Sequence, residues 1–230
     1  MTVRPQITYY GHSCFSILIG GKNILFDPFI TPNPKANMVD VSTIKPDFIC
    51  ISHGHGDHVA DAVSIAKQSN AQVLGAYEVT EWLVNQGITN CIPMNIGGTV
   101  NLGFCTVQMV KAEHSSSFPD GSYAGNAAGF VVKSSEATFY YAGDTALTLD
   151  MQLIPLYSKL DFAFLPIGDN FTMGIKDAAR AAKLVQCKKV VGMHFDTFLP
   201  IEINHSEALD HFESEQLQLT LPLINQTFQL

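Results

Sequence analysis

The segment FICISHGHGDH, residues 48–58, joins an apolar run to four potential metal-ligating side chains within six residues. The apolar part predicts a short buried strand over Phe48–Ser52, and apolar residues then recur at helical spacing between Val59 and Ala66. Imidazole and carboxylate groups suit divalent metals such as zinc, and the intervening glycines allow a sharply turned backbone. On a solvated turn these groups would have no stabilising role, so we interpret residues 53–58 as a loop that contacts two adjacent ions.

Three more potential ligands each follow the end of a predicted strand. They are His114, Asp144 and His194, after strands expected over 104–111, 138–142 and 189–193. Ligands of layered α/β proteins bind beyond the carboxyl ends of strands, so these side chains and the 53–58 loop can meet at one sheet edge. Taken singly, each residue could instead be structural, and Asp144 could cap a helix. Their shared placement favours the metal site.

Strands outnumber helices along the rest of the chain. Further strands are expected over 6–10, 14–19, 22–26, 72–75, 91–94, 99–102, 129–133 and 162–166, and helices over 78–86, 175–185 and 206–215. Gly20 and Gly21 predict a two-residue hairpin turn. No repeat or linker divides the sequence, so we expect one α/β domain over residues 1–230, with sheets covered by helices.

Composition excludes several classes of protein. Of the 230 residues 47% are hydrophobic and 15% charged, which excludes a disordered chain. A net charge of −8 repels polyanions, so we expect no nucleic-acid partner. Five cysteines without two-residue spacing predict free thiols in a reducing compartment. With no signal peptide and no apolar run of membrane-spanning length, we expect a cytoplasmic protein without a membrane partner; the oligomeric state is left open.

These motifs resemble the metallo-β-lactamase superfamily, in which a His-X-His-X-Asp-His loop is followed by a distant His, Asp and His. All are present here in that order. The segments Gly11–Phe15, Asp27–Phe29, Phe171–Gly174 and Gly192–Phe195 resemble more narrowly the small uncharacterised metal-dependent hydrolases related to ascorbate-6-phosphate lactonase. The resemblance implies a four-layer αββα sandwich with the metal site at one sheet edge.

The resemblance also implies a role for each ligand. His53, His55 and His114 would hold one metal, Asp57, His58 and His194 a second, and Asp144 would bridge them. Two divalent ions, with Zn²⁺ expected ahead of Mn²⁺ or Fe²⁺, would then supply a bridging hydroxide as nucleophile. Di-iron relatives that reduce oxygen carry Glu where His55 stands, so His55 favours hydrolysis.

Four more residues are candidates for catalysis or substrate binding. His12 ends the first strand and could transfer protons or orient a ligand, which would make it catalytic together with Asp57 and Asp144. The alternative is a turn histidine. Asp169 and Asn170 follow the strand at 162–166 and could bind substrate or simply form a turn. Lys35, the only cation of the Pro-rich loop after Asp27, could contact substrate or belong to a plain connector.

The expected function is hydrolysis of an ester-type bond, in a lactone or a small phosphodiester, within a small metabolite. The charge and the absence of a recognisable nucleic-acid-binding segment disfavour the nuclease alternative. A non-catalytic metal-binding or sensor protein is a second alternative, and a di-iron oxidoreductase is a third.

Overall fold

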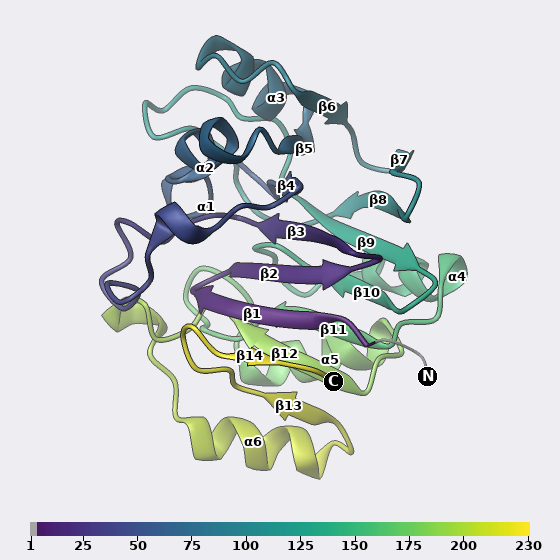
Figure 1. Ribbon diagram of the computed structural model, residues 1–230. Helices are drawn as coiled ribbons and strands as arrows, with labels where there is room; N and C mark the ends of the chain where they lie inside the picture. The colour runs from purple at the N-terminus through teal and green to yellow at the C-terminus, as the bar shows by residue number, and fades with distance from the viewer. Residues whose placement is uncertain (1–3) are drawn as a thin grey trace.

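Two seven-stranded mixed sheets pack face to face in the computed structural model, which describes residues 4–230 (Figure 1). The first has the order β14-β1-β2-β3-β4-β5-β6, with β1 (Gln6–Gly11), β2 (Cys14–Ile19), β3 (Lys22–Phe26), β4 (Phe48–Cys50), β5 (Gln72–Ala76), β6 (Cys91–Met94) and β14 (Thr227–Phe228). The second has the order β13-β12-β11-β10-β9-β8-β7, with β7 (Thr99–Asn101), β8 (Cys105–Lys111), β9 (Ala128–Ser134), β10 (Thr138–Tyr141), β11 (Phe162–Pro166), β12 (Lys189–Met193) and β13 (Gln218–Thr220).

Helices cover the outer face of each sheet. They are α1 (Gly56–Val59), α2 (Ala62–Ser69) and α3 (Tyr77–Asn85) beside the first sheet, and α4 (Ile154–Tyr157), α5 (Ile175–Leu184) and α6 (His205–Ser214) beside the second. Short 3-10 turns lie at Val41–Thr43, Leu149–Leu153 and Leu199–Ile201. Apolar side chains of α2 and α3 pack on β3, β4 and β5, and those of α5 and α6 pack on the strands of the second sheet. The layer order confirms the predicted αββα sandwich.

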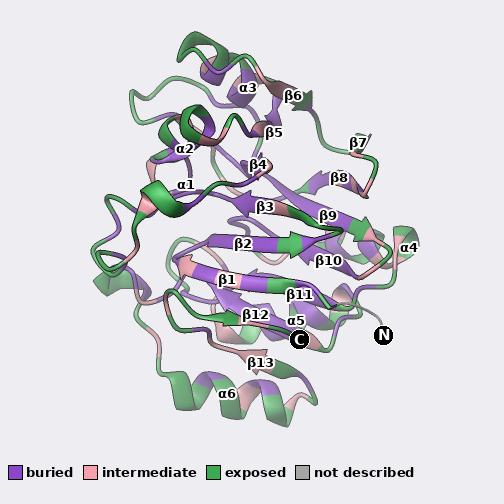
Figure 2. Cartoon of the chain, viewed as in Figure 1, coloured by how far each residue is buried: buried purple, intermediate pink, exposed green. Residues whose placement is uncertain are grey.

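Aromatic side chains fill the space between the sheets. Phe26 of the first sheet stacks on Tyr141 of the second at 4.6 Å between ring centroids, and Phe15 contacts Phe164 across the same interface. All four side chains are fully buried. Figure 2 shows the strands mainly buried and the outward side of α6 exposed. This rigid core fixes the strand ends that carry the polar residues.

Strand direction explains why those residues meet. Strands β1, β3 and β4 run the same way, since β1 and β3 are each antiparallel to β2 and β3 is parallel to β4. In the second sheet β8, β10 and β12 likewise share one direction. In Figure 1 the carboxyl ends of β1 and β3 point to the left edge, where α1 also lies. The polar residues that follow these strands therefore face one edge of the sandwich.

Most elements lie within one or two residues of their predicted bounds. At the predicted hairpin, Gly20 and Gly21 have φ angles of 59° and 70°, which glycine adopts without strain. The helical pattern over 59–66 is divided between α1 and α2, because Asp61 between them turns its carboxylate to the backbone N–H groups of Ile30 and Thr31. The five cysteines are free thiols, as expected.

Strands β13 and β14 were not predicted. They have only three and two residues, mostly exposed or half-buried, so neither shows a pattern of alternating burial. Their pairing with β12 and β1 comes from the neighbouring strands. Over residues 4–230, the helices are too short or too polar to cross a membrane.

Candidate metal centre

Seven side chains converge at this edge of the sandwich. They are the predicted residues His53, His55, Asp57, His58, His114, Asp144 and His194. Four come from the loop between β4 and α1 and from α1 itself, and the other three follow β8, β10 and β12. His53, His58, Asp144 and His194 are almost fully buried, whereas His55, Asp57 and His114 are partly exposed. The cluster is therefore closed on the core side and open on the other.

The histidines form two groups. In the first group, ligand atoms of His53, His55 and His114 all lie within 4.8 Å of one another, with His53 Nε2 2.9 Å from His55 Nδ1. In the second, ligand atoms of Asp57, His58 and His194 also lie within 4.8 Å of one another. Such separations suit three ligands of one ion with bonds of about 2.1 Å.

Asp144 lies between the two groups. Its Oδ2 is 2.9 Å from His194 Nε2, 3.3 Å from His58 Nε2 and 3.7 Å from His114 Nε2. One carboxylate oxygen thus faces both groups, the placement that a bridging ligand requires. Asp144 Oδ1 is buried and has no hydrogen-bond partner among the described residues.

Asp27, at the carboxyl end of β3, orients one histidine of each group. Its Oδ2 accepts hydrogen bonds from the Ser52 hydroxyl and from His58 Nδ1–H, and its Oδ1 accepts the backbone N–H of Ser52. Having given its proton to Asp27, the Ser52 hydroxyl must accept from His53 Nδ1–H, 2.9 Å away. Both rings then turn Nε2 into the cluster, which makes Nε2 the atom that could bind an ion once it is unprotonated.

The donor set fits divalent ions. Besides Asp144 Oδ1, the buried atoms His58 Nε2 and His194 Nδ1 have no hydrogen-bond partner among the described residues. Burying such atoms unpaired costs about 1–3 kcal/mol each, and a cation at the cluster would offset that cost for those that face it. The two carboxylates of the cluster, Asp57 and Asp144, would neutralise part of the charge of divalent ions bound there.

Sequence comparison agrees with this geometry. A sequence model of the family described as "Beta-lactamase superfamily domain" matches residues 6–194. The chain belongs to the metallo-β-lactamase superfamily. A Methylacidiphilum infernorum protein named "UPF0173 metal-dependent hydrolase" is 50% identical over 216 residues, which are 94% of this chain and 96% of that protein. A Flavobacterium johnsoniae protein of the same name is 49% identical over 225 residues, 98% of this chain and all of its own length.

A solved structure of the same superfamily fold extends the comparison. Igni18 of Ignicoccus hospitalis, described as a novel metallo hydrolase, superposes with a TM-score of 0.89 at 31% identity, covering 99% of this chain and 100% of its own. These findings confirm the superfamily that the sequence motifs indicated.

The side chains of the two groups differ in their protonation. Burial lowers the pKa of His53, His55 and His114, so these imidazoles are neutral and available as ligands. Burial opposes ionisation of Asp144, but His194 and His58 lower its pKa well below the usual range. Burial likewise lowers the pKa of His58, but Asp144 and Asp27 outweigh it and raise that pKa. Uptake of a metal ion by His58 would therefore displace a proton from this ring and be favoured as pH rises.

His12 lies beside the second group. Its Nε2 is 3.1 Å from Asp57 Oδ2, its Nδ1 is 2.9 Å from the hydroxyl of Thr197, and its ring lies 4.1 Å from that of His194. Burial, together with the nearby His194, lowers the pKa of His12 to about 4. The ring is therefore neutral near pH 7.

Metal-free protein should lose stability as pH falls from 6.5, the ordinary histidine pKa, towards 4. In that range His12 and His53 become protonated in the unfolded chain but stay neutral in the folded state, so acid favours unfolding. His58 acts in the opposite sense, since its raised pKa contributes stability below 6.5 that is lost as pH rises through its folded value. Urea midpoints of EDTA-treated protein over this range measure the balance. His12→Asn should show a shallower decline, and a pH-independent midpoint would contradict the prediction.

The two glycines of residues 53–58 were predicted to allow sharp backbone turns, but they have other roles. Neither Gly54 nor Gly56 has a positive φ. A Cβ on Gly54 would lie 2.3 Å from that of Ala124, so this glycine permits close packing of the loop at 113–127, and Gly56 begins α1. Ser116 of the same loop accepts the backbone N–H of Gly54, and Ser115 lies 3.5 Å from His55 Nε2.

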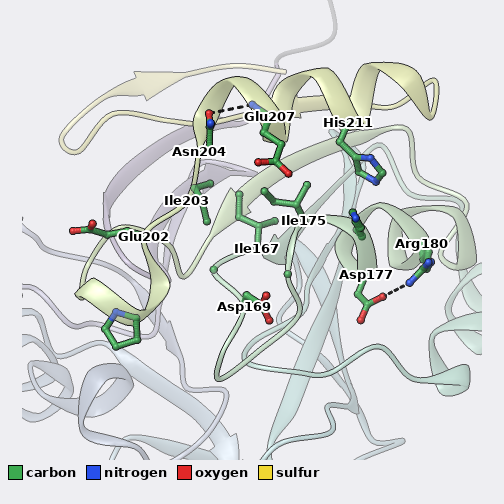
Figure 3. A pocket seen from close by; sticks show the side chains of 14 residues that line it. Ile167, Asp169, Ile175, Asp177, Arg180, Glu202, Ile203, Asn204, Glu207 and His211 are labelled. Atoms are coloured by element: carbon green, nitrogen blue, oxygen red, sulfur yellow. Dashed lines mark hydrogen bonds and ion pairs between the residues drawn. The ribbon is translucent and has the colours of Figure 1, made fainter.

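Asp169 and Asn170 do not join the cluster. Both have positive φ angles and are exposed, and the Asn170 N–H donates to the Asp169 carboxylate within a tight turn. Asp169 lines a separate cavity of about 620 Å³ between the first turns of α5 and α6 (Figure 3), and the lining of that cavity includes none of the seven residues. Their role in substrate binding stays a prediction.

Lys35 is exposed and lines a smaller cavity of about 240 Å³, together with His12, Thr197 and Leu223. Lys35 thus shares a cavity with His12, which contacts Asp57 of the second group. Contact between Lys35 and a substrate also stays a prediction. The sequence reasoning missed Asp27, Ser52 and Thr197 as members of the site. Asp27 had a usable signal, because it follows a strand as the other polar residues do; Thr197 had none.

Proposed function

We propose that this protein is a metal-dependent hydrolase with two divalent ions that cleaves an ester-type bond, a lactone or a small phosphodiester, in a small metabolite. The observation that carries the proposal is the Asp144 carboxylate between two groups of three ligands. The name shared by the relatives at 50% and 49% identity supports the hydrolase class.

Each group of side chains has a distinct task in this proposal. His53, His55 and His114 would hold one ion, Asp57, His58 and His194 the other, and Asp144 both. Divalent ions held in this way lower the pKa of a water molecule towards neutrality and polarise the oxygen of the scissile bond. Asp27 keeps the His58 ring in the required tautomer directly, and the His53 ring through the Ser52 hydroxyl. The partly exposed His55, Asp57 and His114 leave an open side from which a substrate can approach.

Charge supports a small substrate. Within residues 4–230 the cluster forms no ion pair with a lysine or arginine, and the chain carries a net charge of −8. A long polyanion would find little attraction outside the ions themselves. Lys35, at the cavity that also reaches His12, is a candidate contact for the non-reacting part of a small molecule.

The test combines metal analysis with a panel of substrates. Purified protein should bind two Zn²⁺ or Mn²⁺ ions per chain and, once loaded, hydrolyse a simple lactone or bis(p-nitrophenyl) phosphate while leaving long RNA intact at physiological salt. Salt-sensitive cleavage of RNA with both small esters untouched would favour a nuclease. Two bound ions without turnover on any ester would favour a sensor, and a coloured iron-loaded protein that consumes oxygen would favour the oxidoreductase.

A further inference from the structure

His12 is tied to the second group of ligands by its backbone as well as its side chain. Its carbonyl oxygen accepts the N–H of His194 at 2.9 Å and the hydroxyl of Tyr9 at 3.2 Å. Its φ of 57° is an uncommon conformation for a residue other than glycine and costs of order 1–3 kcal/mol. Two hydrogen bonds to this carbonyl oxygen stabilise that conformation. The bond from His194 also connects the turn between β1 and β2 to the end of β12.

The hydrogen bonds of the ring have a direction. The Asp57 carboxylate can only accept, so His12 Nε2 must carry the proton that it donates across 3.1 Å. In the neutral ring Nδ1 is then an acceptor, so the Thr197 hydroxyl donates its single proton to this nitrogen at 2.9 Å in preference to the Phe195 carbonyl oxygen at 3.4 Å. Asp57 thus sets the tautomer of His12, and the hydrogen bond from Thr197 to Nδ1 stabilises that tautomer and the orientation of the ring.

Aromatic side chains flank the His12 ring. The His12 side chain is fully buried, with Phe29 and Phe198 edge-on at 5.4 Å and 5.7 Å between ring centroids. Hydrogen bonds are stronger where water is excluded. Asp57 needs such support, because its side chain is 30% exposed and it lies in α1, a helix of only four residues.

We infer that His12 is a positioning residue of the second metal site: oriented by Thr197, it fixes the Asp57 carboxylate for the ion that Asp57, His58 and His194 would share. The inference rests on the proposed two-ion centre. It distinguishes the two ions, since neither His12 nor Thr197 forms a hydrogen bond with His53, His55 or His114 among the described residues.

The experiment measures zinc affinity at each site by titrating EDTA-treated protein against a competing chelator. Loss of an outer hydrogen-bond partner typically weakens metal binding 10–100-fold, so His12→Asn should weaken one Zn²⁺ site by about that factor and leave the other unchanged. Asn tolerates the positive φ, which protects the fold. Thr197→Val keeps the shape but removes the hydroxyl, and it should weaken the same site by a smaller factor; Thr197→Ser should restore the affinity.

A matched control removes a histidine elsewhere. His211→Asn in α6 changes a residue outside the cluster and should leave both affinities at wild-type values. If Thr197→Val and His12→Asn bind two ions with unchanged affinities, or weaken both sites equally, the positioning role is wrong. If the wild-type protein binds fewer than two ions, the proposed function fails instead, so the two failures are distinguishable.

Discussion

Asp144→Asn should reduce turnover of the metal-loaded protein more than about 100-fold, because the loss of even an outer partner of a ligand costs 10–100-fold. The substitution preserves side-chain size but removes the charge that faces His58, His114 and His194. Without that anionic oxygen, two cations would repel each other across the cluster. We therefore expect bound metal to fall from two ions towards one in elemental analysis, in parallel with the rate measured on the ester that the wild type accepts.

A matched control for Asp144→Asn is Asp169→Asn. Asp169 lies outside the cluster, so its substitution should leave bound metal at the wild-type value. A two-ion Asp144→Asn protein with wild-type turnover would refute the bridging role. Retention of the fold can be checked independently by far-UV circular dichroism of both variants.

Asp27→Asn should destabilise the metal-free protein by about 3 kcal/mol, within the range for breaking a buried charged pair. The Asp27 carboxylate is fully buried and accepts bonds from the Ser52 hydroxyl, the Ser52 N–H and His58, while the Tyr141 hydroxyl lies 2.8 Å from it. An amide has only one acceptor oxygen for these donors, and its N–H₂ group would face other donors. Chemical denaturation of EDTA-treated protein measures the loss.

Asp177→Asn provides the surface comparison for Asp27→Asn. Asp177 pairs with Arg180 on the exposed side of α5, and such pairs contribute well under 1 kcal/mol. If both substitutions lowered the free energy of unfolding equally, the buried network around Asp27 would be no more stabilising than a surface ion pair. Because Asp27 orients His53 and His58, we also expect its variant to bind both ions more weakly.

The local pattern of apolar and polar residues was sufficient to predict many of the helices and strands. Strands such as Phe162–Pro166 and Lys189–Met193 were predicted to the residue, since continuous apolar runs suit strands buried on both faces. The pattern over 59–66 predicted a helix but not its division at Asp61, because the partners of that carboxylate lie some 30 residues earlier in the chain. The short strands β13 and β14 carried too little pattern to be predicted.

The sequence by itself determined the centre of the candidate site, because residues 53–58 place four potential ligands within six residues whatever the rest of the chain does. It also determined that His114, Asp144 and His194 follow strand ends. Only the tertiary structure decided which side chains orient them: His12 meets Thr197 across 185 residues of sequence, and Tyr141 meets Asp27 across 114. Such pairs form because the two sheets pack face to face in one relative position. That position depends on the packing of the whole buried core.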